Sequence, residues 1–539
     1  MRRGGTDGRL VAPIVAYVTL FALLPVAVLF AASIAGAGGV PGIVAALASP
    51  LDRQAIENSL EQGGLSAVLA VALGYPAGVL LGRYDWPGRA AVESALLVPF
   101  LLPSLVVVLG VEDLFGAGGL LAGLWPSLAA LGHGVPGIVV ANLVFNLPLV
   151  VLLTAGGARI ASRELEETVA TLGGPPGRAY RDVWGPATWT GAAAGGLLTF
   201  LFSALSFAPP ILLCGARCYT VEARIWSLDT VLLDPAGAGV LAALVVGLLA
   251  APALAYLALA RRLRGGPGRS PAPPRRLPRS LVTYAVAAEA ALVLVGVGGV
   301  LGAVLYRSVA PTGGGGAGAA WTALFSSATT ARLGIGVAGA VGNTLLFASA
   351  AAGIAVVLVV PAAYAATGRA RAGGGLGLVL FGPLLISPIV LAFALATFWR
   401  PILGGESTVW ALVIVSQAML ALPFALQALS LPLSALAPAP REAAETLGAG
   451  RFAAFLDADL PRVQDGLVTA GLFAFALGLG EFTATNFLVT PRYTTLPVAL
   501  YGLAASRQVA AADAAAGLLL LLSLAVFLAL SIGGRRVEL

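Results

Sequence analysis

The sequence has 539 residues, of which 59% are hydrophobic and only 10% are charged, and its mean hydropathy is +0.95. In a soluble protein, roughly a quarter of all residues are charged. The composition therefore excludes an ordinary soluble enzyme and a disordered chain. The 69 glycines follow no three-residue period, which excludes a collagen-like protein. We conclude that the chain is a membrane protein with several spans.

All 31 basic residues are arginines, and their distribution excludes two further classes of protein. Without a lysine there is no P-loop, so the chain does not bind ATP by that route. The net charge is +6, but the arginines are scattered between apolar runs and form no basic patch. We therefore expect no nucleic-acid partner.

Twelve apolar runs are long enough to cross a bilayer as helices, which requires about 20 residues each. The first six are 10–35, 64–82, 91–111, 135–158, 190–214 and 237–260. The second six are 281–306, 336–366, 376–399, 408–435, 466–489 and 511–533. The first run is too long for a cleaved signal peptide. The predicted fold class is all-α and polytopic, with about 12 transmembrane helices.

Arginine placement predicts the orientation of these spans. If the N-terminus is cytoplasmic, 23 of the 31 arginines lie on the cytoplasmic side. By the positive-inside rule, both termini are then cytoplasmic, and the chain is a multi-pass protein of the cell membrane. The Pro/Arg-rich stretch 261–280 reads as a cytoplasmic linker between a first half, 1–260, and a second half, 281–539.

The two halves repeat each other in the sequence. A constant offset of 275 maps Pro148, Glu167, Gly173, Pro186, Ser206, Phe207 and Thr220 onto Pro423, Glu442, Gly448, Pro461, Glu481, Phe482 and Thr495. Earlier in each half, Asn58-Ser59-Leu60 matches Asn343-Thr344-Leu345. Six spans are an even number, so the two copies have the same orientation. This parallel repeat argues against a transporter built from an inverted pair of bundles.

A cytoplasmic loop between the fourth and fifth spans of each half has unusual content. The first, 164–186, reads ETVATLG from Glu167 and ends in VWGP; the second, 439–461, reads EAAETLG from Glu442 and ends in ADLP. Good helix formers precede each glycine, and Leu165, Val169 and Leu172 share one helical face. We expect Gly173 and Gly448 to end a helix and Pro186 and Pro461 to open the next one.

These loops resemble the EAA loops, of pattern EAA-x3-G-x9-I-x-L-P, of type I ABC importer permeases. We name them the first EAA loop (164–186) and the second EAA loop (439–461). The first departs from the pattern at Thr168, Val169 and Gly185. The resemblance implies a short helix, a glycine break and a second helix that dock on an ATPase subunit. The residues it assigns to docking are Glu167, Gly173, Pro186, Glu442, Ala443, Ala444, Gly448 and Pro461.

The fused two-half chain is similar to the thiamine and iron(III) permease branch. Residues 200–226 resemble thiamine permeases in their Ser-Phe pair and their T-x-E-x-x-I-W ending. Residues 477–501 carry a Glu-Phe pair and T-L-P-V, which iron, thiamine, sulfate and molybdate permeases share. We expect thiamine as the substrate, with iron(III) as the alternative and a sulfate- or molybdate-type oxyanion after it.

The resemblance also implies the partners. Two copies of an ABC ATPase would hold ATP and magnesium, and an extracytoplasmic binding protein would deliver the solute. The chain itself would be no enzyme and would bind no cofactor. A secondary transporter of 6+6 design would need a relay of buried carboxylates or histidines, which this chain hardly offers. A membrane-embedded enzyme would need a catalytic or metal constellation that the predicted spans lack.

Polar residues at membrane depth are costly and mark a pathway or a helix contact. We expect the translocation pathway at Ser206, Phe207, Glu481, Phe482 and Asn486, with helix packing as the alternative role. Asn142, Asn146 and Gln417 are expected to form interhelical hydrogen bonds. No metal site is expected. For Cys214 and Cys218, plain packing, a disulfide and a soft-metal contact all stay open.

Overall fold

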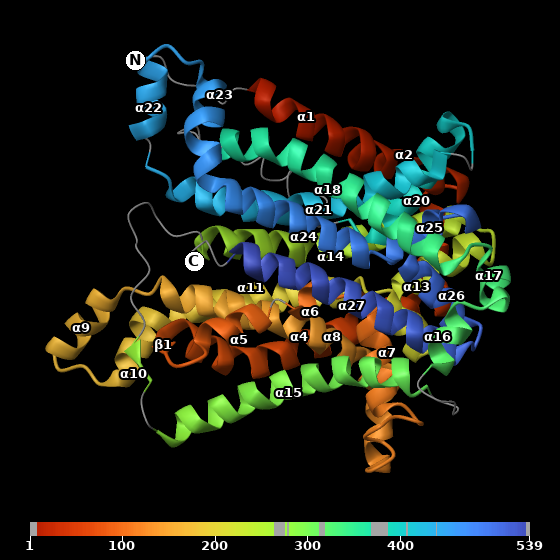
Figure 1. The fold of residues 1–539 in the computed structure, drawn as a ribbon, viewed down its shortest axis with the longest axis horizontal. Helices are drawn as coiled ribbons and strands as arrows, with labels where there is room; N and C mark the ends of the chain where they lie inside the picture. The colour runs from red at the N-terminus through yellow and green to blue at the C-terminus, as the bar shows by residue number, and fades with distance from the viewer. Residues whose placement is uncertain are drawn as a thin grey trace. The chain divides into compact units, whose positions relative to one another are not determined.

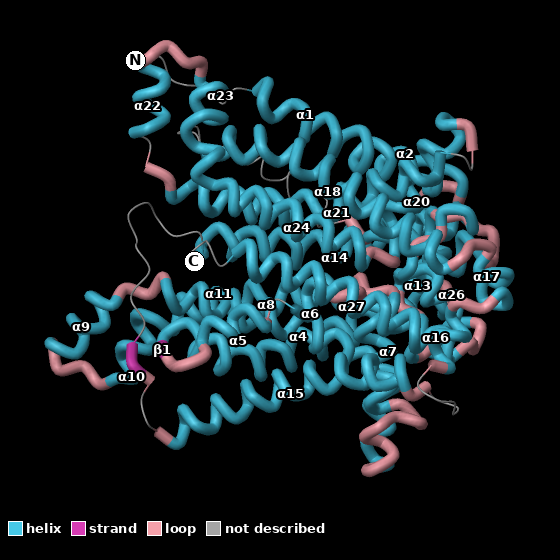
Figure 2. The backbone as a smooth tube through the Cα atoms, viewed as in Figure 1, coloured by secondary structure: helices cyan, strands magenta, loops and turns pink. Residues whose placement is uncertain are grey.

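The computed structural model describes residues 8–96, 98–263, 275–277, 280–311, 318–367, 386–405, 408–437 and 439–534. These residues are mostly helical, and loops are confined to the connections (Figure 1, Figure 2). They form two compact units. The first unit is Val40–Phe100 with Leu105–Arg307, and the second is Met1–Gly39, Leu101–Ser104 and Ser308–Leu539.

The first unit holds two short strands and most helices of the first sequence half. Its elements are α3 Val40–Ala48, α4 Pro50–Arg83, β1 Tyr84–Asp85, α5 Arg89–Ala95, α6 Val98–Leu101, α7 Ser104–Phe115, η2 Pro126–Gly132, α8 Gly134–Arg159, α9 Arg163–Thr171, α10 Pro176–Ala179, η3 Tyr180–Trp184, α11 Gly185–Ala204, α12 Ala208–Leu213, η4 Gly215–Cys218, α13 Val221–Thr230, α14 Pro235–Leu263, β2 Arg275–Arg276 and α15 Leu281–Val309. The strands β1 and β2 pair in parallel.

The second unit is built of helices in the part of the chain that the structure describes. They are α1 Gly8–Val18, η1 Thr19–Leu23, α2 Leu24–Gly36, α16 Ala319–Leu324, α17 Ser327–Leu333, α18 Val337–Thr367, α20 Pro388–Leu403, α21 Val409–Ala435, α22 Ala439–Thr446, α23 Arg451–Ala454, η7 Phe455–Asp459, η8 Leu460–Val463, α24 Gln464–Gly480, α25 Thr483–Leu488, η9 Pro491–Tyr493, α26 Leu496–Ala505 and α27 Val509–Gly534.

The two units do not coincide with the two sequence halves, because the first span of each half packs in the other unit. In the second unit, α1 packs on α18, and the Tyr17 hydroxyl donates to the Val415 carbonyl at 2.8 Å. In the first unit, α15 lies so close to α7 that a Cβ at Gly110 would meet the Val300 carbonyl at 2.6 Å. The sequence boundaries 1–260, 261–280 and 281–539 describe the repeat and stay a prediction.

The chain is a multi-pass membrane protein. Among the described residues, nine helical segments are long and apolar enough to cross a membrane, and they overlap nine of the twelve predicted runs, the run 466–489 only as far as Gly480. They are Leu10–Gly36, Pro50–Arg83, Gly134–Arg159, Pro235–Ala260, Thr283–Val309, Val337–Ala365, Val409–Ser430, Phe452–Gly480 and Val509–Ala529.

The three other runs are not found as continuous helices. Residues 91–111 are divided among α5, α6 and α7, and residues 190–214 between α11 and α12. Proline supplies no N–H, so it sits at helix starts: Pro209 and Pro210 lie in the first turn of α12. The predicted continuous helices were wrong there. For the run 376–399, residues 376–385 lie outside the described residues, and the remainder belongs to α20.

The repeat seen in the sequence is also present in the hydrogen bonds. The Asn58 side chain donates to the Tyr219 carbonyl at 3.0 Å, and the Ser59 hydroxyl accepts from the N–H of Val221 at 2.9 Å. In the second half, Asn343 donates to the Thr494 carbonyl at 3.0 Å. Thr344 accepts from the N–H of Leu496 at 2.7 Å. The Asn-Ser/Thr-Leu motif therefore fixes the start of α13 to α4 and the start of α26 to α18.

Candidate functional site

Both EAA loops begin with a short helix that a glycine ends. In the first, the Ser162 hydroxyl accepts from the N–H of Leu165 at 3.3 Å and so caps α9. Helix α9 is followed by Gly173 with φ +73°, and α22 is followed by Gly448 with φ +95°. A Cβ at either glycine would meet nothing within 4 Å. The left-handed backbone, not a lack of space, therefore requires glycine at both positions.

The hydrogen bonds that close the two helices are the same. In the first EAA loop, Gly174 donates to the Val169 carbonyl at 2.9 Å. In the second, Ala449 donates to the Ala444 carbonyl at 3.1 Å. The preceding glycines bond to Ala170 and Glu445, at 3.0 and 3.1 Å, which completes a Schellman motif in each loop. The predicted helix and glycine break are confirmed in both loops.

A second helical segment leads from each glycine back to a long helix. In the first EAA loop, α10 and η3 run into α11, whose first turn contains Pro186. In the second, α23, η7 and η8 run into α24, and Pro461 lies in the first turn of η8. Figure 1 shows α9 and α10 projecting beyond α11 at the end of the first unit where β1 lies.

The two loops expose a leucine at the same place. Leu172 is 81% exposed and Leu447 is 89% exposed, and each immediately precedes the glycine. The motif carboxylates Glu167 and Glu442 are also exposed, and so is Leu165 on α9. A largely exposed leucine beside a left-handed glycine turn, present twice at the offset of the repeat, forms a small apolar tip on each loop.

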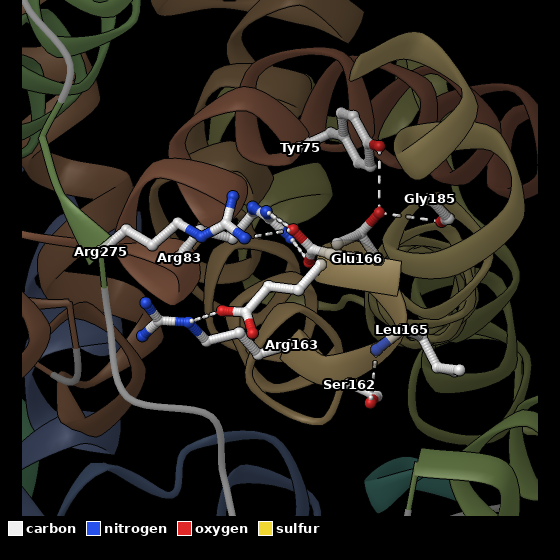
Figure 3. A network of polar contacts seen from close by, with 10 residues as sticks. Tyr75, Arg83, Ser162, Arg163, Leu165, Glu166, Gly185 and Arg275 are labelled. Atoms are coloured by element: carbon white, nitrogen blue, oxygen red, sulfur yellow. Dashed lines mark hydrogen bonds and ion pairs between the residues drawn. The ribbon is translucent and has the colours of Figure 1, made fainter. Parts of the chain in front are cut away.

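Glu166, not Glu167, ties the first EAA loop to the membrane helices. The Arg83 guanidinium donates to both Glu166 carboxylate oxygens at 2.8 Å, and each side chain is only 7% exposed (Figure 3). The Trp184 ring lies 4.2 Å from the same guanidinium. Glu167 instead pairs with Arg163 at the loop surface, at 2.9 Å. Sequence spacing missed Glu166, because nothing in the pattern separates it from its acidic neighbours.

The second EAA loop is held by a different ion pair. At the offset of the repeat, Arg441 stands where the first loop has Glu166, and Asp459 where it has Trp184. Arg441 donates to Asp459 at 3.1 Å, and Asp459 is buried. The charge at this position is therefore reversed between the loops, and the second pair closes inside its own loop.

Aromatic contacts attach the segment after each glycine to a long helix. The Tyr75 ring of α4 stacks on Trp189 at 4.3 Å, and its hydroxyl is 3.1 Å from the Tyr180 hydroxyl. In the second unit, Tyr364 of α18 lies 4.5 Å from Phe455, the counterpart of Tyr180. Both EAA loops are therefore packed onto the membrane helix that contains the Asn-Ser/Thr-Leu motif.

The predicted pathway residues lie at helix breaks. Ser206 and Phe207 separate α11 from α12, and Glu481 and Phe482 separate α24 from α25. The Glu481 carboxylate accepts from the N–H groups of Ala484 at 2.7 Å and Thr485 at 2.8 Å. The continuous span predicted over 466–489 was wrong, because Glu481 caps the start of a new helix.

The other polar side chains behave as the sequence predicts, as links between helices. Asn142 donates to Gln62 at 2.6 Å, and Asn146 donates to the Ser203 hydroxyl at 3.2 Å. Gln417 donates to the Thr485 hydroxyl at 3.3 Å, next to the Glu481 cap. Asn486 is half-buried in α25.

The structure joins Cys214 and Cys218 in a disulfide, one of the three possibilities that the sequence left open. The bridge lies in the turn between α12 and α13, directly after the first helix break.

One known protein family matches part of the chain. Residues 74–265 match the family described as binding-protein-dependent transport system inner membrane component. This stretch runs from α4 to the end of α14 and contains the whole first EAA loop. This stretch of the chain is similar to that family.

Two relatives resemble this chain over most of its length, and a third resembles a smaller part of it. A thiamine transport system permease protein of Salmonella typhimurium is 26% identical over 469 residues, which is 82% of each chain. The thiamine transport system permease protein of Escherichia coli is 26% identical over 507 residues, 89% of each chain. A molybdate/tungstate transport system permease protein of Thermococcus kodakarensis is 28% identical over 184 residues, 34% of this chain and 68% of that protein.

The Arg83–Glu166 pair yields a stability prediction. Glu166→Gln leaves a buried guanidinium without its counter-charge, which costs about 3–5 kcal/mol. The control is Glu167→Gln, which breaks an exposed pair and should change stability by less than about 1 kcal/mol. Thermal unfolding of the purified protein in detergent measures both changes in stability. A Glu166→Gln variant as stable as the control would show that the buried pair does not hold the loop.

Proposed function

We propose that this permease is the membrane subunit of an ATP-driven importer and that its two EAA loops dock two copies of an ABC ATPase. The observation that carries the proposal is the duplicated geometry of the loops. Each presents an exposed leucine and glutamate on a Schellman-capped helix, and each is packed onto a long membrane helix. A docking element needs both an apolar tip for the partner and a stiff connection to the bundle.

The proposed assembly follows from this arrangement. The docking residues are Glu167, Gly173 and Pro186 in the first EAA loop, and Glu442, Ala443, Ala444, Gly448 and Pro461 in the second. ATP and magnesium belong to the ATPase copies, and this chain binds neither and catalyses no reaction. Both termini lie in the cytoplasm with the EAA loops. An extracytoplasmic binding protein delivers the solute to the opposite face.

The solute is proposed to pass beside the two helix breaks, at Ser206, Phe207, Glu481, Phe482 and Asn486. Broken helices at membrane depth are tolerated where they face protein or line a cavity, and the ends of half-helices bind solutes in several transporters. Glu481 supplies a carboxylate at one break, which suits a cationic solute. The counterpart of Glu481 in the first half is the neutral Ser206.

Thiamine is the proposed solute. The thiamine permeases named above align with both halves of the chain, whereas the molybdate/tungstate permease aligns with about a third of it. Thiamine is a cation, in agreement with a single carboxylate at the break. Iron(III) is the second candidate and an oxyanion the third.

Docking is tested by removing the motif from the second EAA loop. The double variant Glu442→Ala/Gly448→Ala loses the exposed carboxylate and strains the left-handed turn, so we expect the ATPase to be lost on co-purification while the permease stays folded. The control is Glu57→Ala, an exposed glutamate near the start of α4. Full recovery of the ATPase with the double variant would exclude docking through this loop.

The solute is tested by uptake. Cells that lack the chain are expected to lose uptake of labelled thiamine, and the wild-type gene, but not Glu481→Ala, is expected to restore it. Co-purification of the ATPase with Glu481→Ala shows that this variant is assembled. Loss of labelled iron(III) uptake with normal thiamine uptake would move the substrate to iron(III). Normal uptake of both thiamine and iron(III) would leave an oxyanion as the candidate solute.

A further inference from the structure

The segment that joins the two sequence halves touches the first EAA loop. Its strand β2, Arg275–Arg276, pairs in parallel with β1, which directly follows α4. In this pairing Arg275 lies opposite Tyr84, the residue next to Arg83. The strands thereby bring the Arg275 side chain to the carboxylate that Arg83 already holds.

Arg275 is a second guanidinium on the same carboxylate. Its Nη2 lies 2.9 Å from Glu166 Oε2, while Arg83 binds both oxygens of Glu166 (Figure 3). Arg275 remains 41% exposed, whereas the side chains of Arg83 and Glu166 are buried. The linker thus covers the open side of a buried pair that is complete without it.

We propose that Arg275 is a positioning residue: it holds the linker on Glu166 and thereby fixes the orientation of helix α9 in the first EAA loop. Three features support this role. The contact is charge-assisted, the backbone pairing of β1 and β2 sets its register, and among the described residues α9 packs chiefly on α10 and η3 of its own loop. Removing Arg275 leaves no buried charge unpaired, so the contact is able to open and close without unfolding the loop.

The second EAA loop has no carboxylate at the position that corresponds to Glu166. Arg441 stands in the place of Glu166, and it would repel a linker arginine instead of binding it. The described linker residue Arg275 therefore meets a carboxylate at this position in the first EAA loop only. A consequence follows that rests on the proposed function. The two ATPase copies bind docking loops that differ in stiffness.

Hydrogen–deuterium exchange on the purified full-length permease tests the proposal without any ATPase or solute. In Arg275→Ala, amides of α9 are expected to exchange about two- to fivefold faster than in the wild type, the range expected for one partly exposed ion pair. The matched control is Arg276→Ala, the exposed neighbour on the same strand. Helix α22 of the second EAA loop is the internal reference and should not change.

Arg275→Lys retains the positive charge and is expected to bring α9 back toward the wild-type rate. If Arg275→Ala does not fold, Arg275→Gln takes its place under the same criteria. Equal α9 exchange in the Arg275 and Arg276 variants overturns the proposal, and so does an equal acceleration of α22. Because no partner is present, these outcomes are independent of whether the ATPase docks or which solute is carried.

Discussion

The buried pair of Arg83 and Glu166 is the constraint on which the first half depends. Two buried opposite charges stay paired, because separating them leaves a buried charge without its counter-charge. Arg83 is the last residue of α4, a 34-residue helix of roughly 50 Å at 1.5 Å per residue. At its other end, Asp52 pairs with Arg224 at 2.6 Å. One continuous helix therefore connects α9 with α13, near the helix break at Ser206.

The second half achieves the same connection with other residues. Helix α18 binds the start of α26 through Thr344 and packs on the second EAA loop through Tyr364. The charges are rearranged, since Arg441 pairs within the loop and Asp459 takes the place of an aromatic ring. The backbone design is thus repeated, while each half has its own anchoring chemistry.

The sequence predicted what depends on local pattern and periodicity. Nine spans, the glycine breaks and the repeat are local features, and the structure contains them. The apolar runs that the structure divides into two or more helices were mispredicted. Hydropathy alone does not detect that a proline pair or the Glu481 carboxylate starts a new helix. Glu166 and Arg275 were missed because their partners lie 83 and 109 residues away in the chain. The packing of the first span of each half in the other unit also depends on contacts between residues that are far apart in the sequence.

The most direct measurement of the central claim is site-specific photo-cross-linking in membranes. A photoreactive side chain at Leu172 or at Leu447 is expected to capture the ATPase subunit, identified by mass spectrometry. The same group at Leu124, an exposed leucine of the first unit outside the EAA loops, is expected to capture none. Capture of the ATPase from Leu124, or from neither EAA loop, would contradict docking at these two leucines.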